Sequence, residues 1–229
     1  MDVVVFDNIS LKIDTKKLNK KLKANNGSFF ASRVEELAKE AEKIAKPKGL
    51  FKLSYIDTKG ENFIVVEDEK LVSRVLRVNV DKVGRIFLFL ATCGREIEDW
   101  SKNYDDMLDT FIVDNIMELA CKEAQKIIFN YIDDKYDLKN ASKMNPGSLS
   151  NWPIKEQRKI FRILKNSNEK IGVELTDSLL MKPAKTVSGI RFSSEVKFEN
   201  CQLCPKDKCP NRAAPYNKQL YAARYGLGK

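Results

Sequence analysis

The sequence contains no histidine among its 229 residues. This absence excludes imidazole general bases, Ser–His and Cys–His nucleophile pairs, and zinc sites that mix cysteine and histidine ligands. It also excludes a histidine of this chain as a ligand to cobalt or to a haem iron. Chemistry at a metal or an acid–base centre would therefore have to use other side chains.

Long hydrophobic runs are absent as well. The longest apolar stretch, residues 86–92, has about a third of the length that a bilayer-spanning helix needs. The short apolar run at residues 3–6 lies between two aspartates and does not resemble the core of a signal peptide. Since 43% of the residues are hydrophobic and 32% are charged, we expect a soluble, cytoplasmic protein with a sizeable core and no membrane partner.

Five cysteines in a chain without an export signal argue against a disulfide framework. Cys121 lies on the apolar stripe of a predicted helix and is expected in the core. Cys201, Cys204 and Cys209 have the spacing Cys-x2-Cys-x4-Cys, which can bring three sulfurs onto one metal ion or cluster. Cys93, at the end of a predicted strand, is the candidate fourth ligand. The spacing leaves three contents open: an iron–sulfur cluster, a structural zinc ion, or free or redox-active thiols.

The net charge of +9 is unevenly distributed. Residues 1–138 carry 23 Lys/Arg and 25 Asp/Glu, a net charge of −2, whereas residues 139–229 carry 18 and 7, a net charge of +11. A basic half favours an anionic partner, although an ordinary solvated surface would look the same.

The pattern of apolar residues predicts helices and strands in separate blocks. Helices are predicted at residues 14–23, 28–46, 95–103, 109–133 and 154–164. Strands are predicted at residues 3–6, 50–56, 62–66, 85–91, 171–175, 178–181, 187–192 and 196–198, with 50–56 and 62–66 forming a hairpin. The last 30 residues show little periodicity. Without βαβ alternation, this order predicts an α+β fold. A stretch rich in Asn, Ser, Gly and Pro divides a helical and β-hairpin part, 1–138, from a basic part, 139–229, within one closely packed unit.

Three motifs follow one another in the second half of the chain. They read Lys-Met-Asn-Pro-Gly-Ser at 143–148, Leu-Thr-Asp-Ser at 175–178, and Met-Lys-Pro-Ala-Lys-Thr-Val-Ser-Gly at 181–189. In order and spacing they resemble three segments of the activation domain of cobalamin-dependent methionine synthase: Arg-x-x-Pro-Gly-Tyr, Leu-Thr-Glu-Ser and Met-x-Pro-x-x-Ser-Val-Ser-Gly. Lys143 stands where that family has arginine, and Ser148 where it has tyrosine. The cysteine cluster is an addition to the family pattern.

The resemblance implies a twisted antiparallel sheet flanked by helices. It also implies a loop that faces the ligand, which in the family is S-adenosylmethionine, and that holds this ligand against the corrinoid of a partner. The residues of the loop in this sequence are Lys143, Asn145, Pro146, Gly147 and Ser148. There, inactive cob(II)alamin is reduced by one electron and captured by the methyl group.

We therefore expect a free-standing accessory protein for the reductive reactivation of a corrinoid protein, such as a methionine synthase that lacks its own activation domain. Cobalamin would be presented by that partner. The cysteine site would relay an electron from a ferredoxin or a flavodoxin. Whether the chain turns over a substrate by itself stays open.

Two other classes of function compete with this hypothesis. One is a non-catalytic binding or assembly module, stabilised by zinc or a cluster, that recognises an acidic partner. The other is a nucleic-acid binder, which the basic half favours. It is disfavoured because the sequence has no helix-turn-helix or RNP-like motif and few basic runs interleaved with aromatic residues.

Overall fold

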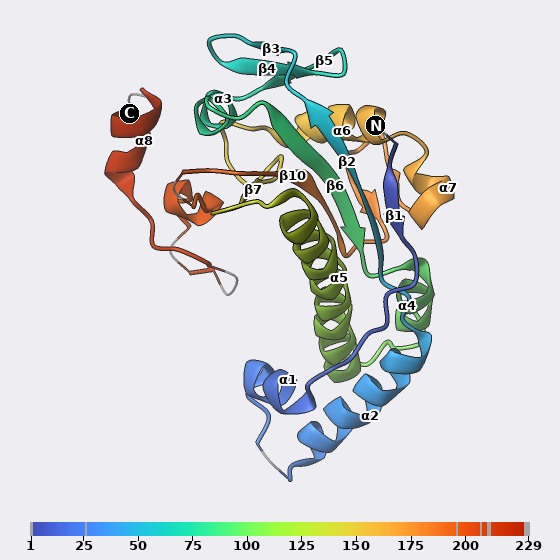
Figure 1. The fold of residues 1–229 in the computed structure, drawn as a ribbon. Helices are drawn as coiled ribbons and strands as arrows, with labels where there is room; N and C mark the ends of the chain where they lie inside the picture. The colour runs from blue at the N-terminus through green and yellow to red at the C-terminus, as the bar shows by residue number, and fades with distance from the viewer. Residues whose placement is uncertain (1, 26, 196, 207, 210–211, 227–229) are drawn as a thin grey trace.

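An antiparallel sheet of five strands runs through the centre of the molecule in the order β1-β2-β6-β10-β7 (Figure 1). The computed structural model describes residues 2–25, 27–195, 197–206, 208–209 and 212–226. The strands of the central sheet are β1 (Val4–Phe6), β2 (Lys48–Tyr55), β6 (Arg85–Thr92), β7 (Ser142–Met144) and β10 (Thr186–Phe192). The middle strand, β6, is buried from Ile86 to Thr92, which explains its unbroken apolar run.

The long helix α5 (Met107–Tyr136) packs on one face of this sheet. Because side chains alternate between the two faces of a strand, Phe87 and Phe89 of β6 point to this side and pack with Ile128 of the helix. The helix also crosses β2 closely. A Cβ atom added to Gly49 would lie 2.2 Å from Cδ1 of Ile128, so only glycine allows this approach.

The opposite face is covered by short elements. They are β3 (Thr58–Lys59), β4 (Phe63–Val66), β5 (Glu69–Val72), α3 (Arg74–Asn79), the 3-10 turn η1 (Ile154–Glu156), α6 (Gln157–Leu164) and α7 (Ser167–Ile171). Leu88 and Leu90 of β6 belong to the core on this side, together with the fully buried Trp152. A two-stranded ribbon, β8 (Glu174–Leu175) and β9 (Met181–Lys182), leads into β10.

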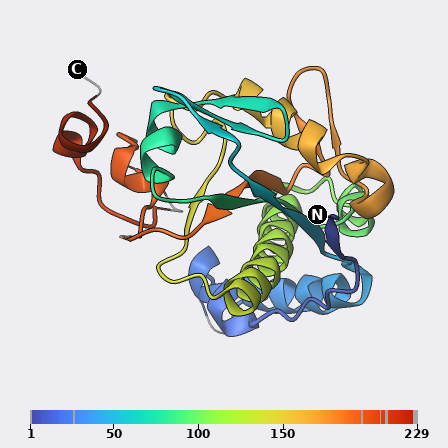
Figure 2. The ribbon, with the colours of Figure 1, turned by 45° about the horizontal axis from the view of Figure 1, so that its top comes forward.

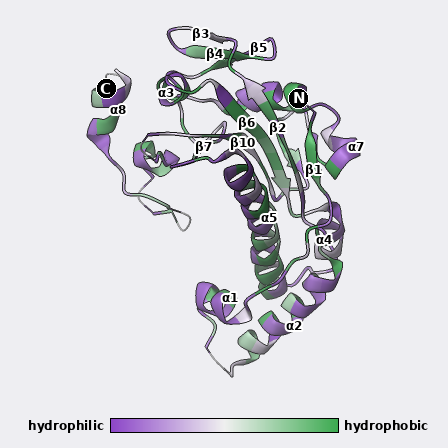
Figure 3. Cartoon of the chain, viewed as in Figure 1, coloured by the Kyte–Doolittle hydropathy of each residue, from purple (hydrophilic) through white to green (hydrophobic). Residues whose placement is uncertain are grey.

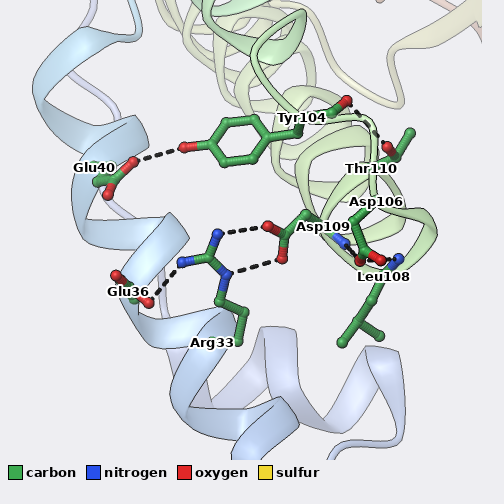
Figure 4. Close-up of polar contacts among 8 residues, drawn as sticks. All are labelled: Arg33, Glu36, Glu40, Tyr104, Asp106, Leu108, Asp109 and Thr110. Atoms are coloured by element: carbon green, nitrogen blue, oxygen red, sulfur yellow. Dashed lines mark hydrogen bonds and ion pairs between the residues drawn. The ribbon is translucent and has the colours of Figure 1, made fainter.

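Three further helices pack around the first half of α5. They are α1 (Thr15–Leu22), α2 (Phe29–Ile44) and α4 (Arg95–Ser101). Figure 4 shows how α2 is fixed there: the guanidinium of Arg33 donates two hydrogen bonds to the carboxylate of Asp109. About two helical turns further along α2, the hydroxyl of Tyr104 donates to Glu40 at 2.8 Å. These contacts hold α2 against the start of α5 and the segment before it.

The C-terminal segment lies at the β7 side of the sheet, far from α7 at the β1 side (Figures 1 and 2). It contains the 3-10 turn η2 (Asn200–Leu203) and the helix α8 (Lys218–Tyr225). Tyr225 anchors the helix, because its ring is fully buried and its hydroxyl donates to Asn79 of α3 at 3.0 Å. The sequence did not predict α8, since its apolar positions are few.

The structure confirms the predicted α+β class and the antiparallel sheet flanked by helices. The predicted hairpin between residues 50–56 and 62–66 is wrong. Strand β2 pairs with β1 and β6, whereas β4 pairs with β3 and β5. The apolar strand β6 occupies the edge of β2 that a hairpin partner would need. The strands predicted at 171–175 and 178–181 shrink to β8 and β9, because residues up to 171 complete α7.

The boundary proposed after residue 138 does not separate two sheets. Strands β1, β2 and β6 come before it, and β7 and β10 come after it, yet all five form one sheet. Of the strand predicted at 196–198, residue 196 lies outside the described residues, and 197–198 are not in a strand. None of the helices in the described ranges combines the length and apolar composition that crossing a membrane requires.

Candidate functional site

The loop predicted to face a ligand, residues 143–148, begins in strand β7 and turns at the edge of the central sheet. Lys143 pairs with Arg191 of β10 across the last rungs of the ladder. The side-chain amide of Asn145 then donates a hydrogen bond to the carbonyl of Ser188 at 2.8 Å, which ties the loop to β10 beyond the end of β7. Pro146 is buried, while the two residues after it are exposed.

Gly147 gives the loop its turn. It has a φ of +83°, in the left-handed region, and its N–H donates to the carbonyl of Trp152 at 2.8 Å. A Cβ atom at this position would lie 2.7 Å from Cδ1 of Ile154 and 3.2 Å from its Cβ. The structure therefore explains the glycine by backbone conformation and by contact with Ile154.

The Lys143 side chain lies against α5. Its Nζ donates to Oε1 of Gln125 at 3.1 Å and lies 5.7 Å from the centre of the Phe129 ring. Burial lowers the pKa of Lys143, because the charged ammonium loses hydration there. The nearby guanidinium of Arg191 stacks 4.1 Å above the same ring and is paired with Asp133. Two cations thus share one aromatic side chain at the entrance to the site.

An open edge of β10 lies next to this lysine. Strand β7 pairs only with residues 190–192, and within the described part of the chain no strand pairs with residues 186–189 on that side. A cavity of about 270 Å³ lies between this edge and α5. It is lined by Lys143, by residues 184–187 around Thr186, and by four residues of α5: Glu118, Cys121, Lys122 and Gln125. The groove presents the edge of β10 and the cation of Lys143 to a polar ligand.

The Cys-x2-Cys segment forms a tight, well-anchored turn. Cys201 and Cys204 lie in and directly after η2, and Leu203 between them is buried in the core. The guanidinium of Arg212 donates to the carbonyls of Cys201 at 3.1 Å and Cys204 at 3.2 Å. The N–H of Ala213 donates to Sγ of Cys201 at 3.3 Å. These contacts fix the backbone of the turn and hold the sulfur of Cys201 beside it.

The two sets of predicted site residues meet in one place. A second cavity, of about 380 Å³, is lined by Lys143 and Ser148 from the loop and by Cys201 and Cys204 from the cysteine turn. Glu199 also lines it. Lys143 belongs to both cavities, so the loop separates the open edge of β10 from the cysteine turn.

The other two predicted ligands, Cys93 and Cys209, do not line the cavity that holds Cys201 and Cys204. Cys209 does not line either cavity. Cys93 is fully buried between α2, α4 and α5, and burial raises the pKa of its thiol to about 12. Lys143 pairs with Arg191 of β10, which pairs in turn with Phe87 of β6. Cys93 comes about six residues after Phe87, so it lies roughly 20 Å from Lys143 along the sheet.

Cys121 was predicted to be a core residue. It is 9% exposed, and burial raises its thiol pKa to about 12, yet it also lines the cavity beside β10. Within the described ranges, no three Cys, Asp or Glu side chains are grouped closely enough to hold a metal ion.

The remaining motifs have structural roles. The hydroxyl of Thr176 donates to the carbonyl of Leu180 and accepts from the N–H of that residue, both at 3.0 Å, which closes the turn between β8 and β9. Residues 181–189 supply β9, the open edge of β10 and a wall of the first cavity. The sequence analysis missed Glu118 and Gln125. A polar residue four positions after Cys121 on an otherwise apolar stripe was the available signal for Gln125.

Comparisons with known proteins bear on the fold and on the family of this chain. No curated protein matches the chain. One solved structure, described as the MetH reactivation domain bound to AdoHcy, superposes with a TM-score of 0.61 over 87% of this chain and 81% of that chain. At 13% identity, this likeness shows the fold alone. The family model described as vitamin B12 dependent methionine synthase, activation domain, matches residues 72–214, more than half of the sequence. The motif resemblance is thereby confirmed, and the chain belongs to the activation-domain family of vitamin B12-dependent methionine synthase.

Proposed function

We propose that this chain docks on a corrinoid-bearing protein and assists its reductive reactivation, with the loop at residues 143–148 turned toward the partner. The observation that carries the proposal is the position of Lys143, which lines both cavities. One cavity runs along the open edge of β10, and the other contains the cysteine turn. A ligand and an electron relay would thus meet at the same loop.

The cavity beside β10 is the proposed site for S-adenosylmethionine. The solved relative is described as binding AdoHcy, the product that remains when that molecule gives up its methyl group. In this chain the ammonium of Lys143 would pair with the ligand's carboxylate as a point charge, and Gln125 would orient that ammonium. Burial lowers the pKa of Lys143 because its ammonium loses hydration, and the carboxylate of a ligand would offset that loss by pairing with the charge.

The overall reaction would combine two steps on the partner's cobalt. One electron would reduce the partner's cob(II)alamin to the Co(I) state, and the methyl group of S-adenosylmethionine would then pass to that cobalt, with S-adenosylhomocysteine as the leaving group. The electron would come from a low-potential donor of the ferredoxin or flavodoxin class. The chain itself would bind the methyl donor and position it.

We propose that Cys201, Cys204 and Cys209 hold an iron–sulfur cluster that relays this electron. Support comes from the Cys-x2-Cys-x4-Cys spacing and from the N–H donated to the sulfur of Cys201. The cavity shared with Lys143 would keep the cluster close to the ligand loop. Cys93 was the candidate fourth ligand. Because it is buried at the far end of β6, we propose that the three other cysteines hold the cluster without it.

The cluster has a direct test. Protein purified without oxygen should contain iron and acid-labile sulfide, and replacing Cys201, Cys204 and Cys209 by serine should remove both. Cys121→Ser is the matched control and should leave them in place. Stoichiometric zinc without sulfide would instead favour a metal-stabilised binding module.

Reactivation is tested with a corrinoid protein from the same cell, a low-potential reductant and absorbance of cob(II)alamin. Lys143→Met should slow the loss of cob(II)alamin when S-adenosylmethionine is present. The control Lys139→Met changes an exposed lysine four residues earlier and should not slow this loss. A rate that ignores S-adenosylmethionine would make the chain an electron-transfer accessory only. If no corrinoid protein binds, the proposed function fails.

A further inference from the structure

A third cavity lies on the neighbouring face of α5, between this helix and α1. Its volume is about 320 Å³. The floor is apolar: Leu11 and Leu18 are almost fully buried, and Ile13 and Leu119 pack beside them. The rim consists of the lysines Lys12, Lys17, Lys21, Lys122 and Lys126, against the two carboxylates Asp14 and Glu123. We call this cavity the lysine groove.

The charge of the lysine groove is local. Residues 12–23 contain six lysines and one aspartate, although residues 1–138 as a whole have a net charge of −2. Figure 3 shows the corresponding contrast, with hydrophilic residues on α1 and hydrophobic residues in the central strands. The groove therefore concentrates positive charge in a part of the chain whose overall composition is slightly acidic.

The walls of the groove are held in place by ion pairs. Glu118 of α5 accepts from Lys21 of α1 at 2.8 Å and from Lys122 at 2.6 Å. At the other end, the carboxylate of Asp14 caps α1 by accepting from the N–H of Lys17 at 3.0 Å. The groove is thus a built feature of two tied helices.

We infer that the lysine groove binds an acidic, amphipathic segment of a partner protein. An apolar floor stabilises leucine-like side chains, while lysine ammonium groups on flexible stems reach carboxylates above it. A nucleic-acid backbone would meet the lysines but would leave the floor without a partner, since phosphate contacts are electrostatic. The charge complementarity and the apolar floor together favour a polypeptide.

This inference goes beyond the proposed function and does not depend on it. The groove and the cavity beside β10 share Lys122 on their common wall, so a segment bound here would lie next to the candidate site. Such a segment would add affinity and orientation to whatever protein the site serves.

The test uses the full-length chain and a short fluorescein-labelled peptide with leucines at helical spacing and glutamates between them. Fluorescence anisotropy would measure its affinity. The double variant Lys12→Glu/Lys17→Glu should weaken binding about ten-fold, because two rim attractions become repulsions. The control Lys16→Glu/Lys20→Glu makes the same charge change on α1, at two lysines that do not line the groove. It should weaken binding by no more than about two-fold.

The peptide itself supplies further controls. A version with serine in place of leucine keeps every charge and should bind more weakly, since it cannot use the apolar floor. Three results would overturn the inference: equal losses in the two double variants, equal affinity for the leucine and serine peptides, or tighter binding of a DNA duplex that both double variants weaken alike. Melting curves would verify that each variant is folded.

Discussion

Glu118 connects the N-terminal helices to the candidate site, and its removal should have a measurable and pH-dependent cost. Its carboxylate lies between Lys21 and Lys122, at 2.8 Å and 2.6 Å. Burial acts to raise the pKa of this group, but the hydrogen bonds from Lys122 and Lys21 outweigh it and lower the pKa to about 2, from 4.5. The ionised form is therefore stabilised by folding.

The magnitude follows from this shift. Taken at face value, a pKa lowered from 4.5 to about 2 corresponds to about 3.4 kcal/mol. The side chain of Glu118 keeps 25% of its surface exposed, so water screens the interaction. We therefore expect Glu118→Gln to lower the free energy of unfolding by about 1 to 2 kcal/mol at neutral pH. Because the folded-state pKa is depressed, this contribution is complete above about pH 4.5 and disappears as the pH falls toward 2.

The assay is urea unfolding of the native chain and the variant between pH 7 and pH 3, at low salt because ions screen the pair. Glu123→Gln serves as the control. Its carboxylate pairs with Lys126 at 3.3 Å on the same helix, and its loss should cost less than about 0.5 kcal/mol. The reasoning is refuted if the two variants lose equal stability, or if the loss in Glu118→Gln is as large at pH 3 as at pH 7.

Three further outcomes follow from the structure. Gly147→Ala should cost more stability than Gly27→Ala, by about 1 kcal/mol or more in thermal melts, because both have a positive φ but only Gly147 meets Ile154; equal costs would contradict the packing explanation. Cys93→Ser should lower the free energy of unfolding by about 1 to 3 kcal/mol, because a hydroxyl replaces a buried thiol, and it should leave the iron content unchanged. Loss of iron in this variant would instead identify Cys93 as a ligand. Arg212→Met should speed amide hydrogen exchange throughout the cysteine turn, and unchanged exchange rates would mean that the carbonyl contacts do not hold it.

The position of Lys143 also bears on how this chain departs from the family motif. Lys143 and Arg191 are cross-strand neighbours, and like charges directly opposite one another are destabilising. Asp133 pairs with Arg191, and the Phe129 ring contacts both cations, which reduces that cost. A guanidinium is thus present at the site even though the motif position holds lysine. We expect Lys143→Arg to retain activity if the carboxylate of a ligand is bound at this point.

Features that depend on a few neighbouring residues could be predicted from the sequence. Asp14 and Ser28 were predicted to begin helices, and their side chains cap α1 and α2, because a cap depends on only a few neighbouring residues. The apolar runs of β6 and α5 were likewise found correctly, since periodicity is written into consecutive positions. The ordered motifs of residues 143–189 were sufficient to identify the family.

Other features depended on which distant segments pack together. The sequence placed Cys93 near the other cysteines in a hypothetical ligand set, whereas the register of β6 with β10 puts it at the far end of the sheet, inside the core. The meeting of Lys143 with Cys201 and Cys204 depends on β7 pairing with β10 and on the tail folding back over that edge. The lysine groove requires α1 to lie across α5, about a hundred residues later in the chain. Such contacts are set by the burial of shared apolar surface, which no local pattern specifies, so only the tertiary structure decided them.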